Sequence, residues 1–256
     1  MEQVPQHAMS SIAPLFTGWE ETPIYSCLQG YMGNAWADSL TAPASAQIIV
    51  GDFCCFAGKP DASLVRNIPE DFPSKEILMI PEHEGWGRLI ENLYPGRYEK
   101  IFRYAIKKEP DVFDRDALEQ YCSTLPAGFT LHVMDKTLYD RAKSEDWSKD
   151  FCAQFPTYEA FQSYGLGVMA LYGDTPVSGA ASYSVYDGGI EIEVDTKMDF
   201  RRKGLALACA AKLILLCLER GLYPSWDAHD LRSVALAGKL GYHMDKAYVT
   251  YVVLAT

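Results

Sequence analysis

The strongest constraint on the fold lies between residues 190 and 221, where a strand pattern, a basic loop and a long apolar helix pattern follow one another. Ile190–Asp195 alternates apolar and acidic side chains, which is the period of a strand with one buried face. Nearly every residue from Leu205 to Leu218 is apolar, and Gly221 gives a helix stop signal. Because unpaired N–H groups and the helix dipole act together at a helix start, residues 201–206 are predicted to bind a phosphate.

The loop between these two patterns concentrates positive charge on an otherwise acidic chain. Arg201, Arg202 and Lys203 are consecutive, while the whole chain has a formal net charge of −11. Residues 1–124 hold 10 basic and 18 acidic side chains, and residues 125–256 hold 13 and 16. A local cationic loop suits a small polyanionic ligand, and the net charge argues against a nucleic-acid partner.

Composition indicates a globular chain with room for one large domain or two modest ones. The chain has 256 residues, of which 48% are hydrophobic. No apolar run reaches the roughly 20 residues that span a bilayer, and the N-terminus lacks a signal-peptide pattern. Cysteine is present in an odd number, seven, and Cys209 and Cys217 lie within the apolar helix pattern. We therefore expect a cytoplasmic protein with reduced thiols and no membrane partner.

Proline and glycine at 125–128 separate two differently patterned halves. We predict an N-terminal α+β module of uncertain role at 1–124 and a second α+β domain at 125–256. The first half shows strands at 46–50, 53–57 and 77–80 and helices at 85–93 and 114–122. The second half shows strands at 129–134, 166–172, 177–186, 189–195, 222–226 and 247–254, and helices at 136–143, within 147–164, at 205–218 and at 231–240. No internal repeat is detectable in the sequence.

Two motifs in the second half resemble those of a known family. Arg201-x-x-Gly204-x-Ala206 matches Gln/Arg-x-x-Gly-x-Gly/Ala, the acetyl-CoA signature of the GNAT superfamily of N-acetyltransferases. Leu240-Gly241-Tyr242 resembles the leucine-glycine-aromatic end of the family's last helix. The resemblance covers about residues 129 to 254. The first half, through Gly51-Asp52-Phe53 and residues 103–109, resembles a branch with an extra N-terminal module that includes antibiotic self-resistance enzymes.

The resemblance implies a GNAT-like mixed, mostly antiparallel sheet flanked by helices, with an additional N-terminal α+β module. It also implies a V-shaped opening between the strands ending near Asp195 and starting near Leu222, which receives the pantetheine arm of acetyl-CoA. The pyrophosphate then lies on backbone amides of residues 202–206. The implied cofactor-binding set is Val194, Asp195, Arg201, Arg202, Lys203, Gly204, Leu205, Ala206 and Ser233. No metal is expected.

Two carboxylates are candidates for the general base. Glu191 and Glu193 are two residues apart on a predicted strand and so share one face. In the family, a carboxylate on the equivalent strand often takes a proton from the attacking amine, and position alone does not say which of the two does so here. The family's frequent general acid, a tyrosine on the last helix, is replaced by Ala237. Tyrosines that could replace it are chosen by composition only: Tyr183, Tyr223 and Tyr242.

These observations favour an N-acetyltransferase that transfers acetyl from acetyl-CoA to a small-molecule amine by direct attack. Because Ala237 replaces the usual tyrosine, a non-catalytic acyl-CoA-binding sensor is the alternative. A generic nucleotide-binding domain is a further alternative, with less support from the sequence. The sequence leaves the acceptor and the oligomeric state open, a homodimer included.

Overall fold

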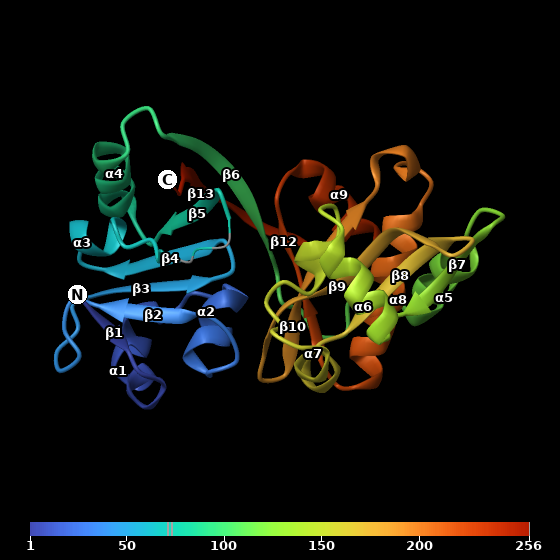
Figure 1. Ribbon diagram of the computed structural model, residues 1–256, viewed down its shortest axis with the longest axis horizontal. Coiled ribbons are helices and arrows are strands. Elements are labelled where there is room, and N and C mark those ends of the chain that lie inside the picture. The colour runs from blue at the N-terminus through green and yellow to red at the C-terminus, as the bar shows by residue number, and fades with distance from the viewer. Residues whose placement is uncertain (71, 73, 256) are drawn as a thin grey trace. The chain divides into compact units, whose positions relative to one another are not determined.

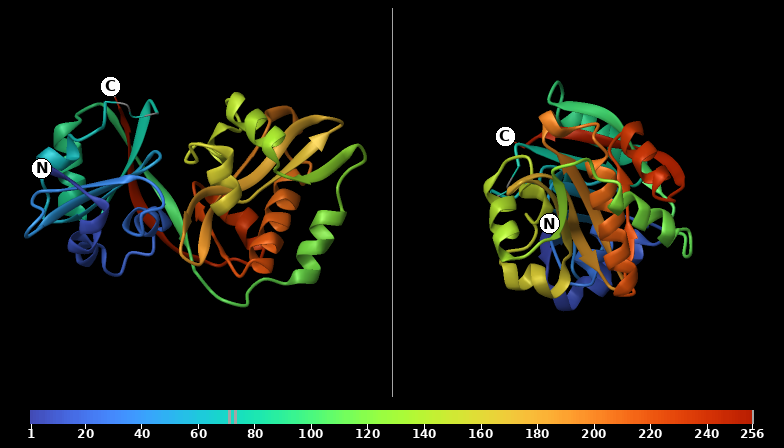
Figure 2. Two further views of the ribbon diagram at one scale, coloured as in Figure 1. Left: turned by 60° about the horizontal axis from the view of Figure 1, so that its bottom comes forward. Right: turned by 90° about the vertical axis from the view of Figure 1, so that its right-hand side faces the viewer.

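A computed structural model describes residues 1–70, 72 and 74–255, and their contacts divide the chain into two compact units. Unit 1 consists of Met1–Arg103 and Ala247–Thr256, and unit 2 of Tyr104–Lys246 (Figures 1 and 2). The division thus falls after Arg103 and after Lys246, whereas the sequence predicts one boundary near residue 125. The last strand belongs to unit 1 because it pairs with a strand from the N-terminal half.

Unit 1 is built on a mixed sheet whose strands lie in the order β1-β2-β3-β4-β5-β13-β6. The short strand β12 (Asp227–Ala228) of unit 2 extends this order, because it pairs with the end of β6 that belongs to unit 2. The strands β1 to β4 are antiparallel neighbours, β5 is parallel to β4, and β13 is antiparallel to β5. Both β6 and β13 continue into unit 2. The elements are β1 (Glu2–Val4), η1 (Gln6–Ala8), α1 (Met9–Ile12), η2 (Ala13–Phe16), α2 (Thr22–Leu28), β2 (Asn34–Ala37), β3 (Ser45–Val50), β4 (Phe53–Gly58), α3 (Ala62–Val65), β5 (Glu76–Pro81), α4 (Glu84–Leu93), β6 (Tyr98–Ile106) and β13 (Met244–Leu254).

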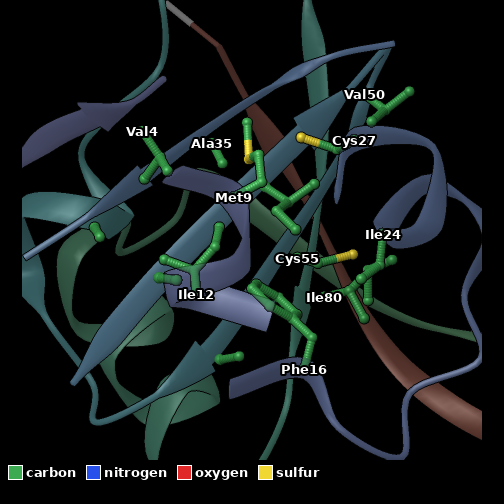
Figure 3. Packing of buried hydrophobic residues seen from close by; sticks show 14 residues of the cluster. Val4, Met9, Ile12, Phe16, Ile24, Cys27, Ala35, Val50, Cys55 and Ile80 are labelled. Atoms are coloured by element: carbon green, nitrogen blue, oxygen red, sulfur yellow. The ribbon is translucent and has the colours of Figure 1, made fainter. Parts of the chain in front are cut away.

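Alternate side chains of the sheet in unit 1 belong to two apolar clusters, one on each face. Ile48 and Cys55 join the cluster that packs with α1 and α2, shown in Figure 3. Ile49 and Phe56 join the other cluster, which contains Trp86 of α4. Because both faces are covered, β3 is buried along its whole length, and its last three residues, 48–50, are all apolar.

Unit 2 is built on a sheet with the order β11-β10-β9-β8-β7, in which only β10 and β11 are parallel. The long helix α8 packs on β8, β9 and β10, and α5 packs on α8 (Figures 1 and 2). The elements are α5 (Arg115–Ser123), β7 (Phe129–Val133), α6 (Lys136–Ser144), η3 (Lys149–Phe151), α7 (Tyr158–Tyr164), β8 (Gly167–Tyr172), β9 (Thr175–Tyr186), β10 (Gly189–Thr196), η4 (Met198–Phe200), α8 (Leu205–Glu219), β11 (Tyr223–Ser225), β12 (Asp227–Ala228) and α9 (Leu231–Lys239).

The structure confirms the α+β class and the elements predicted in the second half. The helix predicted at 205–218 is α8, and the strand predicted at 222–226 is the shorter β11. The helix predicted at 114–122 is α5, and Asp114 caps it, since its carboxylate accepts hydrogen bonds from the N–H groups of Asp116 and Ala117. Thr157 caps α7 in the same way, so residues 147–164 hold one 3-10 turn and one helix.

The C-terminal strand provides a test of this arrangement. Val253 is fully buried opposite Ile77 of β5, whereas the next residue, Leu254, is 46% exposed. Val253→Ala removes two buried methyl groups and should lower the free energy of unfolding by about 2–3 kcal/mol. Leu254→Ala should change it by less than about 0.5 kcal/mol. Urea unfolding followed by circular dichroism measures both, and equal effects would contradict the register of β13.

Candidate cofactor and active site

The parallel strands β10 and β11 pair over a short stretch and then separate. Their register joins Gly189 to Tyr223, Ile190 to Pro224 and Glu191 to Ser225, and β11 ends there while β10 continues to Thr196. The other edge of β10 stays paired with β9 up to Thr196. In the described structure, β11 therefore leaves the 192–196 edge of β10 unpaired, which is where an extended ligand can form backbone hydrogen bonds.

The loop after β10 leads directly to the start of α8. Gly204 precedes the helix with φ = +80°, and Arg202 also has a positive φ of 63°. No side chain caps α8 among the described residues, so the first N–H groups of the helix are open to an anion. Arg201, Arg202 and Lys203 are all exposed beside them. The structure thus brings the predicted phosphate-binding residues together at one helix start.

Arg201 holds the loop against the end of β10. Its Nε donates to the carbonyl oxygen of Thr196 at 3.0 Å, and its guanidinium lies 3.4 Å from the Asp195 carboxylate. The Asp195 carboxylate also accepts a hydrogen bond from the Thr196 N–H at 2.6 Å. An ion pair this exposed adds little stability, but it shapes the loop. Arg201 is therefore engaged with the end of β10, whereas Arg202 and Lys203 are exposed.

A second ion pair anchors the start of the same loop, and no sequence pattern indicated it. Lys197 lies 2.6 Å from Glu145 and 5.3 Å from the centre of the Trp147 ring. The Trp147 indole N–H donates to the same Glu145 oxygen at 2.7 Å. Burial opposes ionisation of Glu145, but the hydrogen bonds from Lys197 and Trp147 outweigh it and lower its pKa. This cluster fixes the point at which the chain leaves β10.

Glu191 and Glu193 lie on one face of β10, as the alternation predicts. The register shift between Glu191 and Ile192 places the extra residue, Tyr183, on β9, so β10 keeps its own period. Glu191 is only 8% exposed and forms the last pair with β11, opposite Ser225. Glu193 is half-buried and lies beyond the point of separation. The two carboxylates therefore occupy different parts of the opening.

Glu191 has a polar neighbour on β11, since Ser225 is its partner in the strand register. The Ser225 hydroxyl is 2.8 Å from the hydroxyl of Tyr186 on β9. The Tyr186 ring lies close against Gly189, where a Cβ atom would be 2.3 Å from the Tyr186 oxygen. Burial raises the pKa of Tyr223, and the charge of Glu191 contributes to the rise. The site therefore holds a nearly buried carboxylate next to neutral hydroxyl groups.

Two of the three tyrosines considered as general acids, Tyr242 and Tyr223, have hydroxyls that hydrogen-bond to backbone groups. Tyr242 is buried, and its hydroxyl donates to the carbonyl oxygen of Pro224 at 2.5 Å. Burial raises its pKa well above the ordinary value. The Tyr223 hydroxyl accepts from the Glu109 N–H at 3.0 Å and donates to the Lys107 carbonyl at 3.3 Å.

Three further positions from the sequence analysis, Ala237, Ser233 and Tyr183, have the following surroundings. Ala237 is fully buried on α9, so this position offers a methyl group where the family often has a phenol. Ser233 lies in the first turn of α9, and its hydroxyl oxygen accepts from the Trp226 indole N–H at 3.0 Å. The Ser233 hydroxyl can still donate one hydrogen bond. Tyr183, at the β9 irregularity, is 7% exposed.

The thiols are poor nucleophiles in this fold. Burial raises the pKa of five cysteines to about 12, namely Cys27, Cys54, Cys152, Cys209 and Cys217. A thiol with such a pKa carries almost no thiolate at neutral pH.

Within the described residues, no group of three or more His, Cys, Asp or Glu side chains has a metal-binding arrangement. No helix in the same residues is long and apolar enough to cross a membrane.

Comparison with known proteins agrees with this geometry. The family described as GNAT acetyltransferase matches residues 13–251. The uncharacterized N-acetyltransferase YdfB of Bacillus subtilis (strain 168) is 26% identical over 268 residues, which cover 98% of each chain. A GCN5-related N-acetyltransferase-like protein from Streptococcus suis is 44% identical with a TM-score of 0.90, over 96% of this chain and 98% of that one.

A more distant solved structure shares the fold alone. A tandem GNAT protein from the clavulanic acid biosynthesis pathway is 11% identical, over 98% of this chain and 94% of that one, with a TM-score of 0.57. Both the family match and these structures span unit 1 as well as unit 2.

Substitution of Gly204 tests directly whether the loop before α8 takes part in CoA binding. A Cβ added at Gly204 meets no protein atom within 4 Å, so Gly204→Ala is strained only by its positive φ, at about 1–2 kcal/mol. Gly173, with φ = +57° and equally open space, is the matched control on a distant turn. Both variants should lose similar stability, while only Gly204→Ala should weaken CoA binding, by about tenfold, or 1.4 kcal/mol. Calorimetry with CoA measures this, and equal affinities would refute the role of the loop.

Proposed function

Because the chain belongs to the GNAT acetyltransferase family, we propose that it transfers the acetyl group of acetyl-CoA to the amine of a small molecule by direct attack. Family membership implies the use of acetyl-CoA and of an acceptor. The observation that carries the proposal is the separation of β10 and β11 beside the uncapped start of α8. The net charge of −11 favours a cationic amine as the acceptor.

Backbone groups of β10 bind the pantetheine arm in this proposal. Val194 and Asp195 lie on the edge that β11 leaves unpaired, so an extended amide chain can add to the sheet there. Amides of residues 202–206 bind the pyrophosphate, and Arg202 and Lys203 neutralise its charge. Leu205 is buried under the loop and Ala206 keeps the helix start free of bulk. Ser233 donates its remaining hydrogen bond to a polar atom of the cofactor.

Glu191, rather than Glu193, is the general base in this proposal. It lies at the point where the strands separate, so a thioester held along β10 has its reacting end next to this carboxylate. Its 8% exposure keeps bulk water from competing for the ammonium proton. Removal of that proton frees the amine lone pair to attack the thioester carbon, and the backbone N–H near Val194 stabilises the oxyanion. Most of the rate comes from holding amine and thioester together.

The departing sulfur needs no strong acid at the Ala237 position. A thiol has a reference pKa of about 8.5, so a thiolate is a good leaving group near neutral pH. The five cysteines whose pKa burial raises to about 12 are unsuited to carry the acetyl group. Both points favour direct attack without a covalent intermediate.

Isosteric substitution of each carboxylate separates the two candidates for the base. Glu191→Gln keeps the shape and removes the proton acceptor, so kcat/KM should fall by about 10²–10⁴. Glu193→Gln should lower it by less than about tenfold, because this side chain lies beyond the separation point. Thiol release from acetyl-CoA with a panel of amines measures both, and CoA calorimetry confirms that the cofactor still binds. A larger loss in Glu193→Gln would reverse the assignment.

The second candidate function is a non-catalytic acyl-CoA sensor, favoured by Ala237 and by the tyrosine hydroxyls that bond to backbone. Tight CoA binding with no thiol release from any amine would support this candidate and contradict acetyl transfer.

A further inference from the structure

Units 1 and 2 share one order of elements. The shared order starts at β1 in unit 1 and at β7 in unit 2, where the end of β6 and α5 come before it. From this edge strand, each unit continues through short helices and then forms three antiparallel strands (β2-β3-β4 or β8-β9-β10). A helix (α3 or α8) then leads to a strand parallel to the previous one (β5 or β11), and a further helix follows (α4 or α9). Element by element, β4 corresponds to β10 and β5 to β11.

We propose that unit 1 is a second copy of the acetyl-CoA-binding fold whose cofactor slot is closed by its own residues, so that the chain binds one acetyl-CoA. This inference rests on the proposed function of unit 2. Its evidence comes from the parallel strand pair, the residues at its end, and the helix that follows.

The strand pair in unit 1 stays closed to within two residues of the end of β4. The register joins Phe53 to Leu78 and continues to the pair Phe56 and Pro81. The N–H of Glu82 then donates to the carbonyl oxygen of Phe56 at 3.0 Å. The equivalent pair in unit 2 stops well before the end of β10. The edge that would bind a pantetheine arm in unit 1 is therefore occupied by β5 and the residue after it.

Side chains complete the closure at the end of β4. The N–H of Gly58 donates to the Glu82 carboxylate at 2.7 Å, and its carbonyl oxygen accepts from the Trp86 indole at 2.9 Å. His83 lies 3.1 Å from the same oxygen. Trp86 is fully buried and stacks on Phe56, with ring centres 5.0 Å apart. Both backbone groups of Gly58 are thus satisfied within unit 1, and a large ring fills the space beside them.

The helix that follows β4 is also unsuited to a pyrophosphate. The helix α3 has four residues, whereas α8 has fifteen. The Asp61 carboxylate caps α3 and accepts from the N–H groups of Ser63 and Leu64. In unit 2, the corresponding amides have no side-chain cap. A carboxylate at this point repels a phosphate and satisfies the donors that would bind it.

Titration of the full chain with CoA counts the sites. Calorimetry should give about one CoA per chain. Two equivalents would overturn the closed slot while leaving the proposed function intact. No binding at all would overturn the proposed function of unit 2, and with it the single site.

Charge reversal in each loop identifies the unit that binds. The double variant Arg202→Glu/Lys203→Glu changes only exposed side chains and should weaken CoA binding by at least a hundredfold, leaving no tight site. Lys59→Glu is the matched control, since Lys59 is exposed in the loop of unit 1 that corresponds to 201–204. It should leave the affinity within about twofold and the stoichiometry at one. Retention of one tight site by the double variant, or its loss in Lys59→Glu, would refute the inference.

Discussion

The separation of β10 from β11 is the constraint on which the rest of the site depends. Backbone N–H and C=O groups inside a folded chain need partners, and a strand in a sheet normally finds them on both sides. Here the pairing with β11 ends at Ser225, while β10 continues to Thr196 with one edge uncovered by β11. The loop that follows is fixed by Arg201 and by the Lys197–Glu145 pair, so the start of α8 faces the same region. An extended ligand with a polyanionic end satisfies both sets of groups.

The two units show how one topology can carry different functions. In unit 1, β5 follows β4 to its end, and Glu82 and Trp86 satisfy the backbone of Gly58. In unit 2, the equivalent groups are open and cations lie beside them. The proposed difference in cofactor binding thus rests on the residues at the end of one strand pair and not on the fold alone. The family match over residues 13–251 includes both units.

Local patterns were enough to predict most of unit 2. Alternation at 190–195, the apolar run of α8 and the Asp230 cap of α9 are each determined by neighbours in sequence. The strand β6 was not predicted, because most of its residues are only partly buried and it lacks an alternating pattern. Pairing of β13 with β5 joins segments at opposite ends of the chain, and no local signal encodes it. The duplication escaped detection because α3 and α8 differ so much in length.

The choice between Glu191 and Glu193 also depends on strand pairing that local sequence patterns do not encode. Spacing places both on one face, but only the end of β11 at Ser225 distinguishes them.

Hydrogen–deuterium exchange of the full chain with and without saturating CoA tests directly whether the cofactor binds where β10 separates from β11. We expect exchange to slow by about tenfold or more at the backbone amides of residues 192–206 and to stay unchanged at residues 53–65. A tenfold slowing corresponds to a rise of about 1.4 kcal/mol in the free energy of local opening. Protection at 53–65, or none at 192–206, would contradict this expectation.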